Sequence, residues 1–161
     1  CALMAGAVPV FADIEPECFC LSPESISRAI TSRTRAIIPV HLCGHPADMD
    51  VIMEIAREHN LRVIEDAAQS IGAVYHSKYT GTIGDCGVFS FNQSKQISTG
   101  EGGMLITDND EIADLAKQVR NHGEVAVNGI LGWNYRMCEI EASLALAQFN
   151  KLETNLAWRI A

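Results

Sequence analysis

Lys95 stands in a part of the sequence that is suited to covalent chemistry. Phe91-Asn92-Gln93-Ser94 precedes it, and Gly100-Glu101-Gly102-Gly103 follows within a few residues. Glycines allow a backbone to approach a ligand closely or to adopt positive φ. A partly desolvated lysine loses its proton more easily and then forms a Schiff base with a carbonyl group. A lysine without such surroundings is usually a solvated surface charge, so the interpretation depends on its neighbours.

Asp66 and Ser90 each follow an apolar segment, and each has two interpretations. Asp66 either caps a following helix or is a buried carboxylate that keeps a pyridinium nitrogen protonated, so that the ring accepts electrons from a substrate carbanion. Gln69 comes about one helical turn later, and it either points near the same ring or lies on the surface. Ser90 either bonds the local backbone or donates to a phosphate, which the amides of a glycine-rich loop also favour.

Other ligand classes lack their motifs in this sequence. There is no Walker-type GxxxxGK[ST], and the glycines at 100–103 do not match GxGxxG, so a nucleotide or dinucleotide site is unsupported. A phosphorylated cofactor with an aldehyde fits the mixture of lysine, aspartate and hydroxyl better. None of the 5 histidines has ligand spacing with a second histidine or cysteine, and we therefore expect no metal.

Composition narrows the classes of partner and location. The 161 residues include 12 basic and 20 acidic side chains, and the net charge of -8 argues against nucleic-acid binding. No apolar run reaches the roughly 18 residues that span a bilayer, so we expect no membrane segment. The 6 cysteines show no paired CxxC spacing, and we expect them to be reduced, as in cytoplasmic proteins.

Apolar segments alternate with helical patterns along the chain. The expected strands are residues 8–14, 35–41, 61–67, 87–91 and 103–107, and the expected helices begin after Ser22 and cover about 47–60, 110–121 and 138 onward. This order predicts one α/β domain with a mainly parallel sheet and helices on both faces. Ligands of such sheets gather outside the carboxyl ends of the strands, where Asp66, Ser90 and Lys95 are expected.

The sequence resembles the DegT/DnrJ/EryC1/StrS aminotransferases in two central motifs, Val63-Ile64-Glu65-Asp66-Ala67-Ala68-Gln69-Ser70 and Phe89-Ser90-Phe91-Asn92-Gln93-Ser94-Lys95, the second followed by Thr99-Gly100-Glu101-Gly102-Gly103. Further matches are Ala5-Gly6-Ala7-Val8-Pro9-Val10-Phe11-Ala12-Asp13, Pro46-Ala47-Asp48-Met49-Asp50 and Gly132-Trp133-Asn134-Tyr135-Arg136-Met137. Members of this family are fold-type I enzymes that use pyridoxal 5'-phosphate (PLP). They aminate keto-sugars, usually nucleotide-linked, or keto-cyclitols, in the biosynthesis of cell-envelope polysaccharides or secondary metabolites.

The resemblance implies roles for individual residues. Lys95 is similar to the lysine that carries PLP as a Schiff base and moves a proton between substrate and cofactor. Asp66, 29 residues earlier, is similar to the partner of the pyridinium nitrogen. Gln69 is similar to a residue beside the cofactor ring, and Ser90 to a phosphate ligand. Asn134 is similar to the asparagine that reaches the phosphate of the neighbouring subunit, which implies a homodimer.

The resemblance also implies the place of this chain in a larger architecture. Residues 1–161 are expected to form the central part of a three-layer, PLP-binding large domain. The family's upstream phosphate loop, its stacking aromatic residue and its smaller C-terminal domain are expected to be absent. The expected substrates are a keto-sugar or keto-cyclitol and an amino donor, glutamate or glutamine, and the expected location is the cytoplasm. Cys43 stands where many relatives have tyrosine.

Three alternatives remain open at this point. Some family members are dehydratases that carry histidine in place of the cofactor lysine, and the presence of Lys95 favours an aminotransferase. A non-catalytic protein that keeps the fold is the second alternative, and the intact set of Asp66, Gln69, Ser90 and Lys95 argues against it. The third is that the chain alone is an inactive fragment, because each missing phosphate or ring contact contributes about 1–3 kcal/mol.

Overall fold

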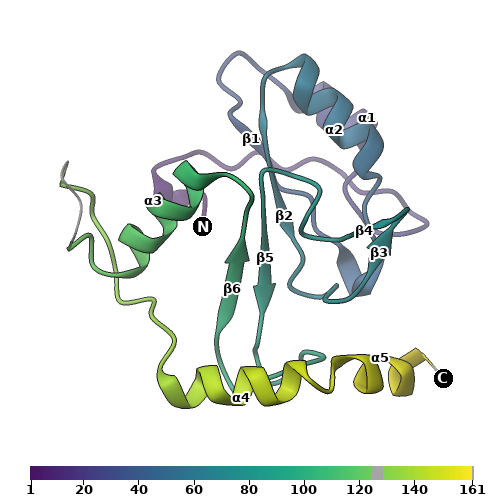
Figure 1. The fold of residues 1–161 in the computed structure, drawn as a ribbon. Coiled ribbons are helices and arrows are strands. Elements are labelled where there is room, and N and C mark those ends of the chain that lie inside the picture. The colour runs from purple at the N-terminus through teal and green to yellow at the C-terminus, as the bar shows by residue number, and fades with distance from the viewer. Residues whose placement is uncertain (125–128, 161) are drawn as a thin grey trace.

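Two adjacent parallel strands, β2 (Arg62–Asp66) and β5 (Cys86–Ser90), form the centre of the fold in the computed structural model, which describes residues 1–124 and 129–160 (Figure 1). The sheet has the order β1-β2-β5-β6, in which β1 is Ala36–Ile37 and β6 is Gly103–Ile106. β1 pairs with β2 and β2 with β5 in parallel. The prediction of a mainly parallel sheet is confirmed.

β6 runs antiparallel to β5, with Ser90 opposite Gly103. Only residues 91–102 separate the two strands, and a parallel return needs a crossover that is usually a helix. The chain therefore turns back directly, and the loop between the strands contains Lys95. The antiparallel direction was not predicted, because an apolar run has no sign that indicates the direction of its strand.

The helices begin and end close to the predicted positions. The structure contains α1 (Pro23–Ala29), α2 (Met49–Glu58), α3 (Asp110–Arg120), α4 (Glu139–Phe149), α5 (Leu152–Ile160), and 3-10 turns at Leu3–Ala5 and Leu42–Gly44. Ser22 Oγ accepts from the Ser25 N–H at 3.5 Å and so caps α1. The single helix expected from Cys138 onward is divided into α4 and α5.

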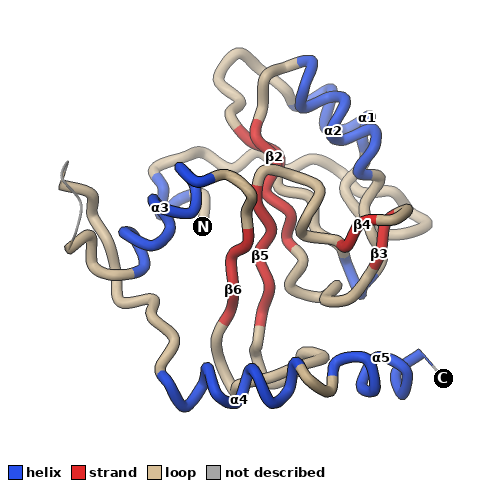
Figure 2. Tube along the Cα trace, viewed as in Figure 1, coloured by secondary structure: helices blue, strands red, loops and turns tan. Residues whose placement is uncertain are grey.

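The hydrophobic core lies where α1 and α2 meet β1 and β2. Met49 and Ile52 of α2, Ile37 of β1 and Val63 of β2 are all buried there. α1 and α2 lie side by side, and α2 packs on β2. In the view of Figures 1 and 2, α4 and α5 run along the end of the molecule toward which β5 points. No helix in the described ranges is long and apolar enough to cross a membrane.

The strand predicted for residues 8–14 is wrong. Val8, Val10 and Phe11 are 84%, 70% and 92% exposed, and only Ile14 takes part in a bridge, with Leu21. An apolar segment becomes a strand only when a neighbouring strand accepts its backbone hydrogen bonds, and no strand of the described sheet lies beside this one. The sequence pattern indicated the apolar character of the segment but not the missing partner.

A short hairpin that the sequence did not predict supports the start of α2. β3 (Val74–Tyr75) and β4 (Lys78–Tyr79) form it. The Tyr75 hydroxyl donates to Asp48 Oδ1 at 3.0 Å and accepts from the Asp50 N–H at 3.3 Å. Burial, with the nearby Asp48 carboxylate, raises the pKa of Tyr75. Tyr75 thus satisfies a backbone donor that the first turn of a helix leaves without an intrahelical partner.

Replacement of Tyr75 by phenylalanine tests this contact. The change removes both hydrogen bonds and keeps the ring, so we expect the free energy of unfolding to fall by about 1 kcal/mol in urea denaturation. Tyr79→Phe is the matched control, because Tyr79 lies in the same hairpin and is 59% exposed. Equal effects of the two changes would contradict the role of the Tyr75 hydroxyl.

Candidate active site

Asp66 lies at the carboxyl end of β2, between β1 and β5. Its N–H donates to the Pro39 carbonyl at 2.8 Å, and its own carbonyl accepts from the His41 N–H at 3.1 Å. Its side chain is half-buried, and Oδ1 accepts from the Ala68 N–H at 3.1 Å. No helix follows for it to cap, since the next element is β3. Its carboxylate is therefore held by the turn itself, with Oδ2 left unbonded among the described residues.

Lys95 lies in the loop between β5 and β6, and that loop is closed by its own hydrogen bonds. The Lys95 N–H donates to the Asn92 carbonyl at 3.0 Å, and the Asn92 side chain donates to Glu101 Oε1 at 2.9 Å. Gly100 and Gly102 have φ of 88° and 138°, which side chains with a Cβ rarely adopt. The glycines next to Lys95 thus allow a tight loop that holds the half-buried lysine at the edge of the sheet.

Gln69 and Lys95 line the same cavity of about 290 Å³. The other lining residues are Cys43, Ser94, Gln96 and Arg159. Gln69 Oε1 accepts from the Cys43 N–H at 2.8 Å, so part of its amide holds the loop after β1. Cys43 has φ of 54°, an uncommon conformation for a residue other than glycine. The cavity therefore joins the loops that follow β1, β2 and β5.

Ser90 and Asn134 occupy different surroundings. Ser90 ends β5, next to β2, and its Oγ accepts from the Asn92 N–H at 3.3 Å, which leaves the hydroxyl proton to donate to a phosphate. Asn134 is exposed, bridges to Asn121, and accepts from Arg136 Nε at 3.0 Å. Four of the predicted residues thus lie at the carboxyl ends of β2 and β5 or just beyond them: Asp66, Gln69, Ser90 and Lys95. Asn134 lies in the segment between α3 and α4.

Glu65, the residue before Asp66, is completely buried. Its carboxylate accepts from the backbone N–H groups of Gly81 at 2.7 Å and of Ile83 and Gly84 at 2.6 Å each. Glu65 Oε2 also lies 2.9 Å from His41 Nε2. Burial raises the pKa of Glu65, but the hydrogen bonds from His41 and from the three amides outweigh it, and the pKa lies below its ordinary value.

The tautomer of His41 follows from its two contacts. The Ala47 N–H donates to His41 Nδ1 at 3.1 Å, so Nδ1 carries no proton. Nε2 must then carry the ring proton, and it donates that proton to Glu65. Glu65 and His41 therefore tie the loop after β1 to the turn that leads into β5.

The sequence indicated only one part of this arrangement. Successive side chains of a strand point to opposite sides, and Glu65 is indeed buried while Asp66 is half-buried. The buried pair with His41 was not predicted, because residues 41, 65 and 81–84 are distant in the sequence. Gln96 was also missed, and its position next to Lys95 was the only available signal.

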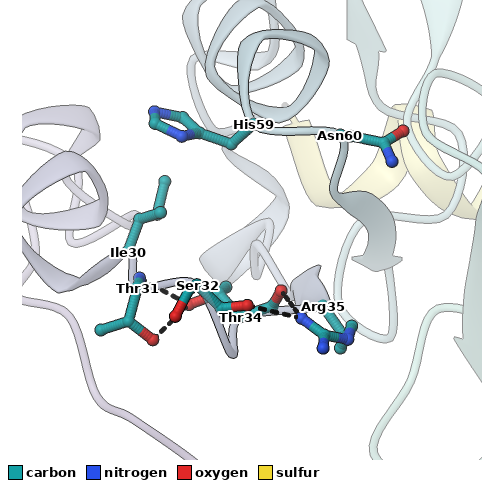
Figure 3. A pocket seen from close by; sticks show the side chains of 7 residues that line it. All are labelled: Ile30, Thr31, Ser32, Thr34, Arg35, His59 and Asn60. Carbon is teal, nitrogen blue, oxygen red and sulfur yellow. Dashed lines mark hydrogen bonds between the residues drawn. The ribbon is translucent and has the colours of Figure 1, made fainter.

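A larger cavity of about 490 Å³ lies at the opposite, amino ends of β1 and β2 (Figure 3). Arg35 Nη1 donates to the carbonyls of Ser32 and Thr34, so its guanidinium is engaged within its own loop. His59 and Asn60 point away from each other, and no group of polar side chains converges there (Figure 3). Ligands of α/β sheets gather at the carboxyl ends, so the Lys95 cavity is the better candidate despite its smaller volume.

The groups at and just beyond the carboxyl ends of β2 and β5 fit a phosphorylated aldehyde such as PLP. Lys95 offers an amine at the wall of the cavity, Asp66 a carboxylate oxygen, and Ser90 a hydroxyl donor.

No group of three or more histidine, cysteine, aspartate or glutamate side chains within residues 1–124 and 129–160 has the geometry to hold a metal ion.

Comparisons with known proteins agree with this chemistry. The model of the DegT/DnrJ/EryC1/StrS aminotransferase family matches residues 1–161. The chain is 46% identical to GDP-perosamine synthase of Caulobacter vibrioides, over 96% of this chain and 43% of that protein. It is 44% identical to UDP-N-acetyl-3-dehydro-alpha-D-glucosamine 3-aminotransferase of Acidithiobacillus ferrooxidans, over 93% of this chain and 42% of that protein. The chain thus spans less than half the length of these curated relatives.

Solved structures confirm the fold. An aminotransferase from Psychrobacter cryohalolentis has a TM-score of 0.87 at 39% identity, over 93% of this chain and 42% of that one. NtdA from Bacillus subtilis, with its bound cofactor PMP, has a TM-score of 0.84 at 39% identity, over 94% of this chain and 35% of that one. The predicted fold, the PLP-dependent transferase type, is therefore confirmed.

Replacement of Glu65 by glutamine tests the buried network. A glutamine side chain presents an NH2 group to backbone N–H donors, so we expect a loss of about 3 kcal/mol in the free energy of unfolding at pH 7. Urea denaturation measures the loss. Glu58→Gln, on the exposed end of α2, should change it by less than about 0.5 kcal/mol.

The same network predicts how stability depends on pH. The pKa of Glu65 is lowered in the folded protein, so its stabilisation is complete above the unfolded-state pKa of about 4.3. It is lost as the pH falls through the lower, folded-state pKa. The decline in unfolding free energy below about pH 4.3 should be smaller in Glu65→Gln than in the unchanged protein. Identical declines would contradict the assignment.

Proposed function

Because this chain belongs to the DegT/DnrJ/EryC1/StrS aminotransferase family, we propose that it carries the cofactor site of a PLP-dependent sugar or cyclitol aminotransferase. The observation that carries the proposal is the shared cavity of Lys95 and Gln69, in the loops that follow the strands ending at Asp66 and Ser90. The names of the relatives support a sugar substrate, since they include a GDP-perosamine synthase and a UDP-sugar 3-aminotransferase. The chain is also 41% identical to a putative L-glutamine:3-amino-2,3-dideoxy-scyllo-inosose aminotransferase of Streptoalloteichus tenebrarius. This name supports a cyclitol as the alternative substrate.

PLP, when bound, supplies an aldehyde and a ring that accepts electrons from the substrate. Lys95 would hold the cofactor through Nζ and would move a proton at the substrate carbon. Asp66 would keep a proton on the ring nitrogen, for which its Oδ2, unbonded among the described residues, is suited. Ser90 would donate its hydroxyl proton to the phosphate, since its Oγ already accepts from the Asn92 N–H. Gln69 would lie beside the ring, and its Oε1 holds the loop at Cys43 in place.

Asn134 has a different proposed role, in a homodimer. It is exposed and shares no described contact with the other four residues, which supports a role toward a second copy of the chain. In this proposal Asn134 donates to the phosphate held by the partner, and residues 1–161 are the central part of a large domain. The proposed amino donor is glutamate or glutamine, and the proposed location is the cytoplasm, which the six free thiols support.

Borohydride trapping of the PLP-loaded protein at its natural length tests the proposal. Borohydride reduces a Schiff base to a stable amine, and peptide mapping by mass spectrometry then locates the modified lysine. We expect the label on Lys95, with a visible absorbance band that Lys95→Ala abolishes. Amino transfer should fall by about a thousandfold or more in that variant, because both attachment and proton transfer are lost.

Lys117→Ala is the control for the loss of a lysine. Lys117 lies on α3, is exposed and pairs with Asp114 at 3.1 Å, so its replacement should leave the band and the turnover unchanged. Turnover retained by Lys95→Ala would contradict the assignment of Lys95 as the cofactor lysine, as would a label on another lysine. Elimination without net amino transfer in the unchanged protein would instead favour the dehydratase alternative.

A further inference from the structure

Gln96, next to Lys95, joins two segments of the candidate site. Its Nε2 donates to the backbone carbonyl of Gln69 at 3.0 Å. Its side chain is half-buried and lines the same cavity as Lys95 and Gln69. A single amide thus connects the loop that holds Lys95 to the turn that follows Asp66.

The carbonyl of Gln69 is fixed relative to Asp66. Asp66 Oδ1 accepts from the Ala68 N–H at 3.1 Å, and the Ser70 N–H donates to the Ala67 carbonyl at 3.0 Å. These two bonds fold residues 66–70 into a tight turn, so a group that binds the Gln69 carbonyl is held at a defined distance from the Asp66 carboxylate.

The other half of the Gln96 amide is not satisfied. Gln96 Oε1 is buried and has no hydrogen-bond partner in the part of the chain that the structure describes. A buried acceptor without a donor lowers the stability of the fold, and an apolar side chain of the same length would avoid this loss. Folding alone therefore does not favour glutamine at this position, and the bond to Gln69 is what the amide supplies.

α5 closes the same loop from its outer side. Asn155 Nδ2 donates to the Gln96 carbonyl at 3.4 Å, and Arg159 Nη2 lies 3.5 Å from the Lys95 carbonyl. Both contacts hold the backbone of residues 95 and 96 and neither reaches residues 66–70. The Gln96 side chain is thus the direct link between the loop and the turn among the described contacts.

We propose that Gln96 is a positioning residue, whose amide holds the amine of Lys95 in register with the carboxylate of Asp66 across one bound cofactor. The inference rests on the proposed function, because it requires Lys95 to carry PLP. Lys95 and Asp66 come from separate loops, and displacement of reacting groups by about 1 Å lowers a rate by as much as a hundredfold. Gln96 limits that displacement.

Two variants of the PLP-loaded protein at its natural length test the proposal. Gln96→Met keeps the length of the side chain and removes the amide. We expect its single-turnover rate to fall by about tenfold to a hundredfold and the pH midpoint of its absorbance band to shift. Its thermal unfolding midpoint should stay near that of the unchanged protein, because the unsatisfied oxygen is removed with the bond. A purely structural role would lower that midpoint instead.

Gln96→Glu gives a second, pH-dependent signature. At about pH 8 its carboxylate repels the Gln69 carbonyl, and its rate relative to the unchanged protein should be low. At about pH 5 a carboxyl group beside a carbonyl and out of water is protonated and donates to it, so the relative rate should recover. Gln118→Met, at a half-buried glutamine on α3, is the control and should match the unchanged protein at both pH values.

The outcomes separate the two claims. A label at Lys95 in the unchanged protein, together with an unaltered rate and band midpoint in Gln96→Met, overturns the inference alone. A Gln96→Glu variant whose relative rate does not depend on pH overturns it as well. A label at a lysine other than Lys95 overturns the proposed function and the inference with it.

Discussion

The buried carboxylate of Glu65 is the constraint on which the site depends. An ionised carboxylate out of water is strongly unfavourable unless its oxygens are fully hydrogen-bonded. Here three backbone N–H groups at residues 81–84 and the His41 ring provide those bonds. The loop after β1, the end of β2 and the turn before β5 must therefore keep their relative positions, because a shift of any of them leaves the charge unpaired.

Adjacent acids on one strand have opposite roles in this arrangement. Glu65 is fully buried and stabilises the framework, while Asp66 is half-buried at the carboxyl end of β2. Strand alternation is enough to separate the two roles. The glutamine amides add a second level of support, since Gln69 holds the Cys43 loop and Gln96 holds the Gln69 turn. The site is thus built on short polar links between loops whose ends the sheet has already fixed.

Local features of this fold could be predicted from the sequence, and non-local ones could not. Ser22 followed by proline marked the start of α1, and the acid at the end of an apolar run placed Asp66 at the end of β2. The direction of β6 and the exposure of Phe11 depend on which segments lie beside them, and apolar patterns do not indicate neighbours. The Glu65–His41 pair and the Gln96–Gln69 bond were missed for the same reason. Their partners are 24 and 27 residues apart in the sequence.

In the proposed site, Lys95 and Asp66 bind different parts of one cofactor, the aldehyde and the ring nitrogen. A crystal structure of the protein at its natural length with PLP tests it most directly. We expect continuous density from Lys95 Nζ to the aldehyde carbon, and a carboxylate oxygen of Asp66 within hydrogen-bond distance of the ring nitrogen. A cofactor bound through another lysine, or a ring nitrogen that faces solvent with Asp66 turned away, would contradict it.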